Sequence, residues 1–242
     1  MKWAILSDVH GNRDALLPVL EDLREQGAEQ VAFLGDGVGY GAEPNECLSL
    51  IRDLTGWAVA GNHDWGAVGL TDIEKFNPAA RAAIVWTGQN LSRANASYLR
   101  GLPLLLKCGG ITFVHASPAA PGEWDYVVSS LEAEEAFRSL EGDVAFIGHS
   151  HRPRAHALEP GGRLRFVGGD RLRLESGVRY VINVGSVGQP RDGNPDAAYG
   201  LYDDSTREYV LRRVSYPIAN AQRKILKAGL PSFLANRLSR GM

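Results

Sequence analysis

The chain has 242 residues, of which 44% are hydrophobic and 22% are charged, and its formal net charge is −2. These values are typical of a globular protein, and they exclude a disordered chain and a strongly basic nucleic-acid-binding protein. No apolar stretch approaches the roughly 18 residues of a membrane span, and the N-terminus lacks the layout of a signal peptide. The two cysteines, Cys47 and Cys108, do not form a disulfide framework. We therefore expect a cytoplasmic protein with no membrane contact.

Strand and helix signals alternate in the first half of the chain. Apolar runs at residues 2–7, 30–35 and 57–60 predict three strands. Helix-spaced apolar residues between these runs predict two helices, one that contains Pro18 and one over 44–54. Because proline lacks a backbone N–H, the first helix should either start late or bend. Strands separated by helices predict a parallel sheet with right-handed crossovers.

The middle of the chain, residues 65–102, lacks strand signals and is predicted to be helical. Two apolar runs at 104–107 and 112–115 flank a glycine pair, which predicts a β-hairpin. Further along, Ser129 followed by Glu132 forms the pattern of a helix capping box.

After an apolar run at 144–148, the sequence changes to short alternating strands separated by glycine-rich turns, which predicts antiparallel pairing. The tail from 218 to 238 is predicted to be helical, with an interruption near 229–231. No linker or internal repeat divides the sequence, so we expect a single domain over residues 1–242 that contains two sheets. The short strands are expected near residues 155–158, 164–167, 180–184, 198–203 and 208–214.

Five of the six histidines lie in polar segments directly after apolar runs, whereas His156 lies within a strand. In an extended chain, residues i and i+2 point to the same side. Asp8 with His10, and His149 with His151, are therefore expected to form two chelating pairs. The full set of candidate metal ligands is Asp8, His10, Asp36, Asn62, His115, His149 and His151.

Seven candidate ligands are too many for one tetrahedral zinc ion. They fit two divalent cations about 3.5–4 Å apart that share one carboxylate. The ligands offer nitrogen and oxygen without sulfur, which favours Mn, Fe, Co, Ni or Zn over Cu(I); among these we favour Mn. Each segment alone has a simpler explanation, since a glycine–aspartate pair is usually a turn and His115 alone could be a core histidine.

The order of these segments resembles the signature of the calcineurin-like metallophosphoesterases. Residues 35–41 and 183–191 further resemble loops of the small bacterial and archaeal branch of that family, except that Val184 stands where many members have proline. The resemblance implies a four-layer α-β-β-α sandwich, in which two mixed β-sheets are flanked by helices. The resembling series is Asp8-x-His10, Gly35-Asp36, Gly61-Asn62-His63-Asp64, His115 and Gly148-His149-x-His151.

The same resemblance implies how the ligands are shared. Asp36 would bridge two metal ions, and His63 would face the substrate phosphate without binding metal. One ion would be held by Asp8, His10, Asp36 and His151, and the other by Asp36, Asn62, His115 and His149.

These residues predict a binuclear-metal-dependent phosphoesterase that hydrolyses small phosphodiesters. A hydroxide that bridges two cations supplies a nucleophile at neutral pH, because metals lower the pKa of bound water. His63, hydrogen-bonded to Asp36 or to Asp64, would stay protonated and act as the general acid, an effect of about 10²–10⁴-fold. The alternatives are a phosphomonoesterase or protein phosphatase at the same site and, in a different class, a non-catalytic interaction scaffold.

Four side chains are candidates for contacting the substrate: Asn12, Asn62, His63 and Arg191. Asn12 could instead cap the helix that follows it, and Arg191 could instead form a surface salt bridge. Trp124 and Tyr126 could stack on a nucleobase or serve only in packing. We expect a small phosphoester or nucleotide-like substrate and no extended nucleic acid; the sequence leaves a homo-oligomer open.

Overall fold

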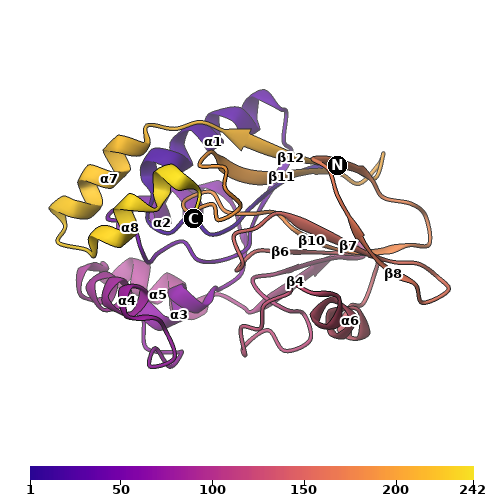
Figure 1. Ribbon diagram of the computed structural model, residues 1–242, viewed down its shortest axis with the longest axis horizontal. Helices are drawn as coiled ribbons and strands as arrows, with labels where there is room; N and C mark the ends of the chain where they lie inside the picture. Colours follow the sequence, from indigo (N-terminus) through magenta and orange to yellow (C-terminus); the bar gives the residue numbers. More distant parts are fainter.

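Strand β1 (Lys2–Leu6) contributes to two apolar layers at once. Successive side chains of a strand point to opposite faces, and residues 3–6 are all buried. Trp3 and Ile5 lie in an apolar cluster between two β-sheets, whereas Ala4 and Leu6 lie in a second cluster beneath helices. A third cluster joins the other sheet to a helix. The structure, a computed structural model that describes residues 1–242, therefore has four layers (Figure 1).

Each of the two sheets has six strands. The first sheet has the order β3 (Trp57–Ala58), β2 (Gln30–Phe33), β1, β11 (Ala197–Asp203), β12 (Glu208–Val214) and β9 (Arg171–Arg173). The second has the order β4 (Leu105–Cys108), β5 (Ile111–Val114), β6 (Val144–Ile147), β10 (Arg179–Asn183), β7 (Arg154–Leu158) and β8 (Leu164–Val167). Both are mixed: β1, β2 and β3 are parallel while β11 is antiparallel to β1, and β10 is parallel to β6 but antiparallel to β7.

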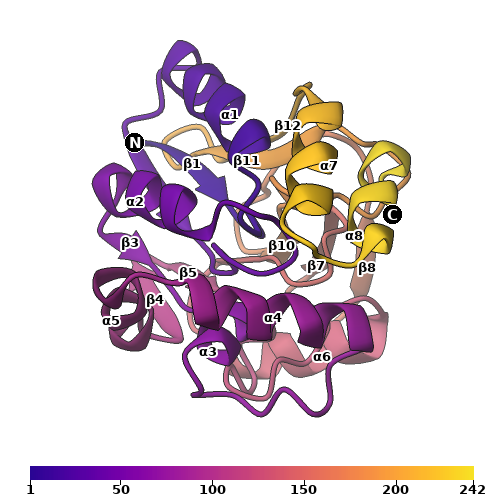
Figure 2. The same cartoon turned by 90° about the vertical axis from the view of Figure 1, so that its left-hand side faces the viewer.

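Helices cover the outer face of each sheet. Helix α6 (Ser130–Ser139) packs on the second sheet through Ala133, Ala136 and Phe137. On the other side, a larger group shares one apolar cluster with the first sheet, and Figure 2 shows α7 and α8 beside the strands and α4 in front. This group consists of α1 (Arg13–Glu25), α2 (Pro44–Leu54), α4 (Pro78–Asn90), α5 (Arg93–Gly101), α7 (Ile218–Lys227) and α8 (Ser232–Asn236). Short helix α3 (Asn62–Ala67) contacts α4 and α5, and the chain ends in a 3₁₀ turn at Leu238–Arg240.

Most predicted elements agree with the structure. The three parallel strands, the β4–β5 hairpin and the capping box of Ser129 and Glu132 are confirmed. The helical tail is interrupted between α7 and α8, as expected. Helix α1 begins at Arg13 and continues through Pro18, so it does not start late.

The predicted antiparallel pairing of the late strands is confirmed for β7 with β8 and β10 and for β11 with β12. The division of the chain into a parallel half and an antiparallel half is nevertheless wrong. Strands β6 and β10 pair in parallel within the second half, and the late strands β11 and β12 extend the first sheet. The short strand β9 was not predicted, because one leucine between two arginines gives no apolar run. The mixed sheets implied by the family resemblance are confirmed, whereas the extent of a single domain stays a prediction.

The helices of this fold lack the combination of length and apolar character that a bilayer crossing requires. Cys47 and Cys108 are both free thiols.

Replacing Phe146 by alanine should strongly destabilise the fold. Phe146 is fully buried between the sheets and packs against Phe113 and Tyr202. Because the cavity left behind cannot fully collapse, we expect the free energy of unfolding to fall by about 3–5 kcal/mol. Urea denaturation followed by circular dichroism measures this loss. The matched control is Phe166→Ala on β8, where the side chain is 59% exposed and the loss should stay below about 1 kcal/mol. Equal losses would contradict the packing described here.

Candidate active site

The predicted metal ligands follow the carboxyl ends of strands from both sheets. Asp8 and Asp36 follow β1 and β2, and Asn62 follows β3 after three residues. His115 and His149 follow β5 and β6 of the other sheet. Because the strands of each group are parallel, their carboxyl ends meet at one edge, and the two edges face one another across the site. All seven predicted ligands are buried.

The backbone at five of these ligands is left-handed rather than extended, with φ angles between 50° and 65°. Asp8 and His10 therefore do not converge through the i, i+2 alternation of an extended strand, which was the predicted reason. That reason also fails for His149 and His151, which belong to different ligand groups. Left-handed geometry in a residue other than glycine costs on the order of 1–3 kcal/mol, and such strain gathers at functional sites. The five residues are Asp8, His10, Asp36, His149 and His151.

Asp8, His10 and His151 form the first group of potential metal ligands. Oδ1 of Asp8 lies 3.5 Å from Nε2 of His10 and 3.2 Å from Nε2 of His151. The two Nε2 atoms are 3.1 Å apart. The Nδ1 atoms contact the backbone carbonyl oxygens of Val38 and Gln189 at 2.9 and 2.6 Å. Because a carbonyl oxygen only accepts, each Nδ1 carries the ring proton and each Nε2 presents a lone pair.

Asp36 lies between this group and a second one. Its Oδ2 atom is 3.6 Å from Nε2 of His10 and 3.3 Å from Nε2 of His115. His115 in turn bonds a backbone carbonyl through Nδ1, and its Nε2 lies 3.2 Å from Oδ1 of Asn62. His149 completes the second group. Asp36 is thus the carboxylate that both groups can reach.

The two carboxylates each leave one oxygen without a hydrogen-bond donor. Oδ1 of Asp8 and Oδ2 of Asp36 are buried and have no hydrogen-bond partner. An unsatisfied buried acceptor costs about 1–3 kcal/mol, and more when it is charged. These oxygens face imidazole nitrogens, so the site collects acceptors at one point. A cation satisfies such a set, and carboxylate oxygen with imidazole nitrogen suits a divalent transition metal.

Burial and charge set the protonation of three histidines. Burial lowers the pKa of His149 and of His151 to about 3, which keeps both rings in the neutral form that binds metal. Burial acts in the same direction on His115, but the adjacent Asp36 carboxylate outweighs it and raises the pKa of His115 to about 9. A proton and a metal ion therefore compete for His115.

Asp64 positions the loop that carries Asp36. Its carboxylate accepts hydrogen bonds from the backbone N–H groups of Asp36, Gly37 and Gly61 at 2.7, 2.9 and 3.1 Å. Burial, together with the charge of Asp36, raises the pKa of Asp64 to about 7. The expectation that Asp64 hydrogen-bonds His63 is therefore wrong, because the Asp64 oxygens bond backbone N–H groups instead.

His63 faces the site, but no carboxylate holds its ring. The backbone N–H of His63 donates to Oδ1 of Asp36 at 2.8 Å, whereas ring Nδ1 has no hydrogen-bond partner. Burial lowers the pKa of His63 well below its ordinary value, so the expected protonation through a carboxylate hydrogen bond is not met. Packing positions the ring instead, with its centroid 4.4 Å from that of Tyr40 and 5.2 Å from that of Phe76. Neither Tyr40 nor Phe76 is predicted as a site residue from the sequence; only the resemblance of the 35–41 loop points to Tyr40.

Asn12 and Arg191 differ as candidates for contacting a substrate. Oδ1 of Asn12 caps α1 by accepting a backbone N–H at 3.2 Å, and its Nδ2 donates to the carbonyl oxygen of Gly188 at 2.8 Å. Both polar ends are used within the protein, so the helix-cap alternative accounts for Asn12. Arg191 forms no ion pair, and its guanidinium lies 5.5 Å from the centre of the Tyr40 ring. Arg191 therefore remains a candidate for binding an anion.

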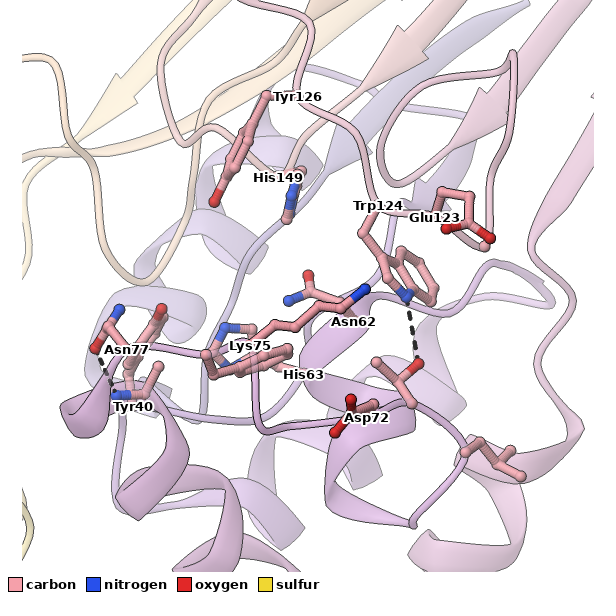
Figure 3. A pocket seen from close by; sticks show the side chains of 15 residues that line it. Tyr40, Asn62, His63, Asp72, Lys75, Asn77, Glu123, Trp124, Tyr126 and His149 are labelled. Atoms are coloured by element: carbon pink, nitrogen blue, oxygen red, sulfur yellow. Dashed lines mark hydrogen bonds between the residues drawn. The ribbon is translucent and has the colours of Figure 1, made fainter.

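A cavity of about 620 Å³ opens beside the ligands (Figure 3). Asn62, His63 and His149 line this cavity, and so do Trp124 and Tyr126. Tyr126 stacks on His149, with ring centroids 4.1 Å apart and ring planes 16° apart. Trp124 and Tyr126, the two aromatic residues noted in the sequence, thus line the cavity next to the predicted metal ligands.

Comparison with known proteins shows which family this fold and site represent. Residues 1–206 match the calcineurin-like phosphoesterase superfamily domain. The structure of a metallophosphoesterase from Sphaerobacter thermophilus superposes with a TM-score of 0.87 at 38% identity and covers 100% of this chain and 99% of that one. An uncharacterised protein of Methanocaldococcus jannaschii is 40% identical over 242 residues, which are 98% of this chain and 97% of the other. Phosphodiesterase YfcE of Escherichia coli is 26% identical over 217 residues, 84% of this chain and 88% of its own.

The fold and the clustered histidines and carboxylates define a phosphoester hydrolase with groups suited to divalent metal ions. The chain belongs to the calcineurin-like phosphoesterase superfamily. The resemblance read from the order of its motifs is confirmed.

Replacing Gly39 by alanine should displace His63 and lower phosphoesterase activity. The φ angle of Gly39 is +88°, and an added Cβ would lie 2.4 Å from Nδ1 of His63. Because a shift of about 1 Å in an active site costs on the order of 100-fold in rate, we expect a loss of that size in a metal-supplemented assay. Gly69→Ala is the control, since its φ is +77° but nothing lies within 4 Å of the added Cβ. Full activity in Gly39→Ala would show that His63 does not need this position.

Proposed function

We propose that the protein is a phosphodiesterase that hydrolyses small phosphodiesters with the help of two divalent metal ions. The observation that carries the proposal is the convergence of buried acceptor atoms on Asp36, which lies between two groups of histidines. Similarity to a phosphodiesterase of Escherichia coli supports the choice of a diester. The net charge of −2 disfavours a nucleic-acid polymer, whose binding depends on many basic side chains.

The donor atoms fit two ions that share Asp36. When bound, the cations would polarise the phosphoryl oxygens and lower the pKa of a water molecule between them. Ligands that offer nitrogen and oxygen suit Mn, Fe, Co, Ni or Zn, and the carboxylate and amide oxygens favour Mn. One ion would be held by Asp8, His10, Asp36 and His151, and the other by Asp36, Asn62, His115 and His149.

The remaining polar groups would bind and protonate the substrate. Oδ1 of Asn62 points at His115, which leaves its Nδ2 hydrogens for a phosphate oxygen. The His63 ring lies next to Asp36 on one side and lines the cavity on the other. A diester seated between the ligands and the cavity would therefore place its leaving oxygen near His63. The negative charge of the diester would oppose the effect of burial on the pKa of His63 and favour the protonated ring. His63 would then act as the general acid. Arg191, above Tyr40, would hold a further phosphate oxygen.

Two alternatives use the same residues. A phosphomonoesterase or protein phosphatase would need the same ligands and the same acid. A non-catalytic scaffold has no use for a complete set of ligands, and here all seven ligands and His63 are present and buried, which favours an enzyme. A cytoplasmic location and assembly into a homo-oligomer stay predictions.

Removing divalent metal should abolish hydrolysis of bis-(p-nitrophenyl) phosphate, and Mn²⁺ should restore it. Metal analysis of the restored protein should give about two ions per chain if Asp36 bridges a pair. Turnover of this diester should exceed that of p-nitrophenyl phosphate under the same conditions. Faster turnover of the monoester would favour the phosphatase alternative, and full activity after treatment with EDTA would exclude the proposed mechanism.

His63→Gln tests the proposed general acid. A poor alkoxide leaving group needs a proton, whereas p-nitrophenolate leaves without one. We therefore expect the variant to lose about 10²–10⁴-fold in kcat on dialkyl phosphodiesters and much less on p-nitrophenyl esters. Its metal content should equal that of the wild type. A loss that is independent of the leaving group would assign His63 to binding the phosphate instead.

A further inference from the structure

The cavity beside His63 is larger than a phosphate group needs. Its volume of about 620 Å³ falls within the range of roughly 300–1,000 Å³ that is usual for small-molecule sites. If the proposed function holds, the leaving group departs on the side where the general acid stands. Because His63 lines this cavity, the group that fills it is the leaving alcohol of the diester.

Trp124 forms a fixed aromatic wall of the cavity. Its Nε1 donates to Oγ1 of Thr71 at 3.3 Å, which joins the loops on the two sides of the cavity. Its ring meets Trp65 edge-on, with centroids 5.8 Å apart. Its φ angle of +61° is unusual for a bulky residue, and strain of this kind is often kept at a ligand clamp. The indole is therefore held in place before any ligand enters.

Two further aromatic rings line the same space. Tyr126 is 48% exposed and stacks on His149. Phe76 lies on the opposite loop beside His63. Flat faces on several sides suit a planar ring, since stacking on aromatic side chains contributes to binding whatever the identity of the base.

The charged groups of the cavity bear both signs. Lys75 extends across it towards Trp124 and Asn62 (Figure 3), and Asp72 and Glu123 lie at its margin. One positive and two negative side chains disfavour a second phosphate. They suit a neutral group that has both hydrogen-bond donors and acceptors, as nucleobases do.

We propose that this cavity is the leaving-group subsite and that it takes a nucleoside whose base stacks on Trp124. The inference rests on the proposed phosphodiesterase function. The metal ligands would contact only the phosphate, so by themselves they would not distinguish one diester from another. In this proposal, Trp124 and the two loops that its indole joins determine which diester is bound.

The test compares two diesters and one ligand on the Mn²⁺-loaded protein. The diesters are adenylyl-(3′→5′)-adenosine, which has a nucleoside leaving group, and glycerophosphoglycerol, which has an aliphatic one; the ligand is adenosine, titrated by calorimetry. Trp124→Leu removes the stacking surface and Trp124→Phe keeps one. Trp86→Leu on α4 is the matched control, because the same change is made at a tryptophan outside the cavity. Metal content is measured for every variant.

We expect Trp124→Leu to lower kcat/KM for the dinucleotide, and to weaken adenosine binding, by about tenfold or more. Hydrolysis of glycerophosphoglycerol should change less than about threefold, and Trp124→Phe and Trp86→Leu should resemble the wild type. An equal loss on both diesters would make Trp124 a purely structural residue and overturn the inference. Failure of the wild type to bind adenosine or to prefer the dinucleotide would overturn it while leaving the proposed function intact. No turnover of either diester would instead refute the proposed function, and the inference would fall with it.

Discussion

Buried acceptor atoms that face one another without a donor are the constraint on which the rest of this structure depends. The Nε2 atoms of His10 and His151 are 3.1 Å apart, and carboxylate oxygens of Asp8 and Asp36 lie beside them. Backbone carbonyl groups fix this arrangement, because each accepts a hydrogen bond from an Nδ1–H and thereby directs the lone pair of Nε2 inwards. The arrangement is costly unless a positive charge occupies its centre. The three apolar clusters of the fold hold the strand ends in place, so the acceptor atoms cannot move apart to avoid this repulsion.

The precision of the site comes from backbone as much as from side chains. The carboxylate of Asp64 accepts hydrogen bonds from backbone N–H groups of the Asp36 loop, and the backbone N–H of His63 donates to Oδ1 of Asp36. Gly61 lies so close that a Cβ there would be 2.1 Å from Oδ1 of Asp36. The loops after β2 and β3 are therefore interlocked, and the orientation of the central carboxylate follows from how they meet. A change of conformation in either loop would therefore alter the orientation of the Asp36 carboxylate.

The sequence predicted the composition of the site better than its geometry. The order of the motifs identified the residues, because the ligands lie in short polar segments that follow strands, and such segments are visible as polar breaks after apolar runs. Convergence of Asp8 and His10 was predicted for the wrong reason, since left-handed backbone has no signature in residue spacing. The separation of His149 from His151 into two groups was visible only through the family resemblance.

Phe76 and Lys75 were not predicted, because they lie on an irregular loop whose position at the site depends on how α3 and α4 pack. The local sequence pattern predicted nearly all of the strands, but it could not assign them to sheets. For example, β11 comes late in the sequence and yet pairs with β1.

The position of β11 and of Gln189 has a consequence for the nascent chain. All the candidate ligands have been synthesised once residue 151 is made. The carbonyl that orients His151 nevertheless belongs to residue 189, and β1 acquires its second neighbour, β11, only with residues 197–203. Until residue 189 is present, Nδ1 of His151 lacks the carbonyl oxygen that turns its Nε2 towards Asp8. The geometry that would distinguish one divalent cation from another is therefore complete only after the last quarter of the chain has docked.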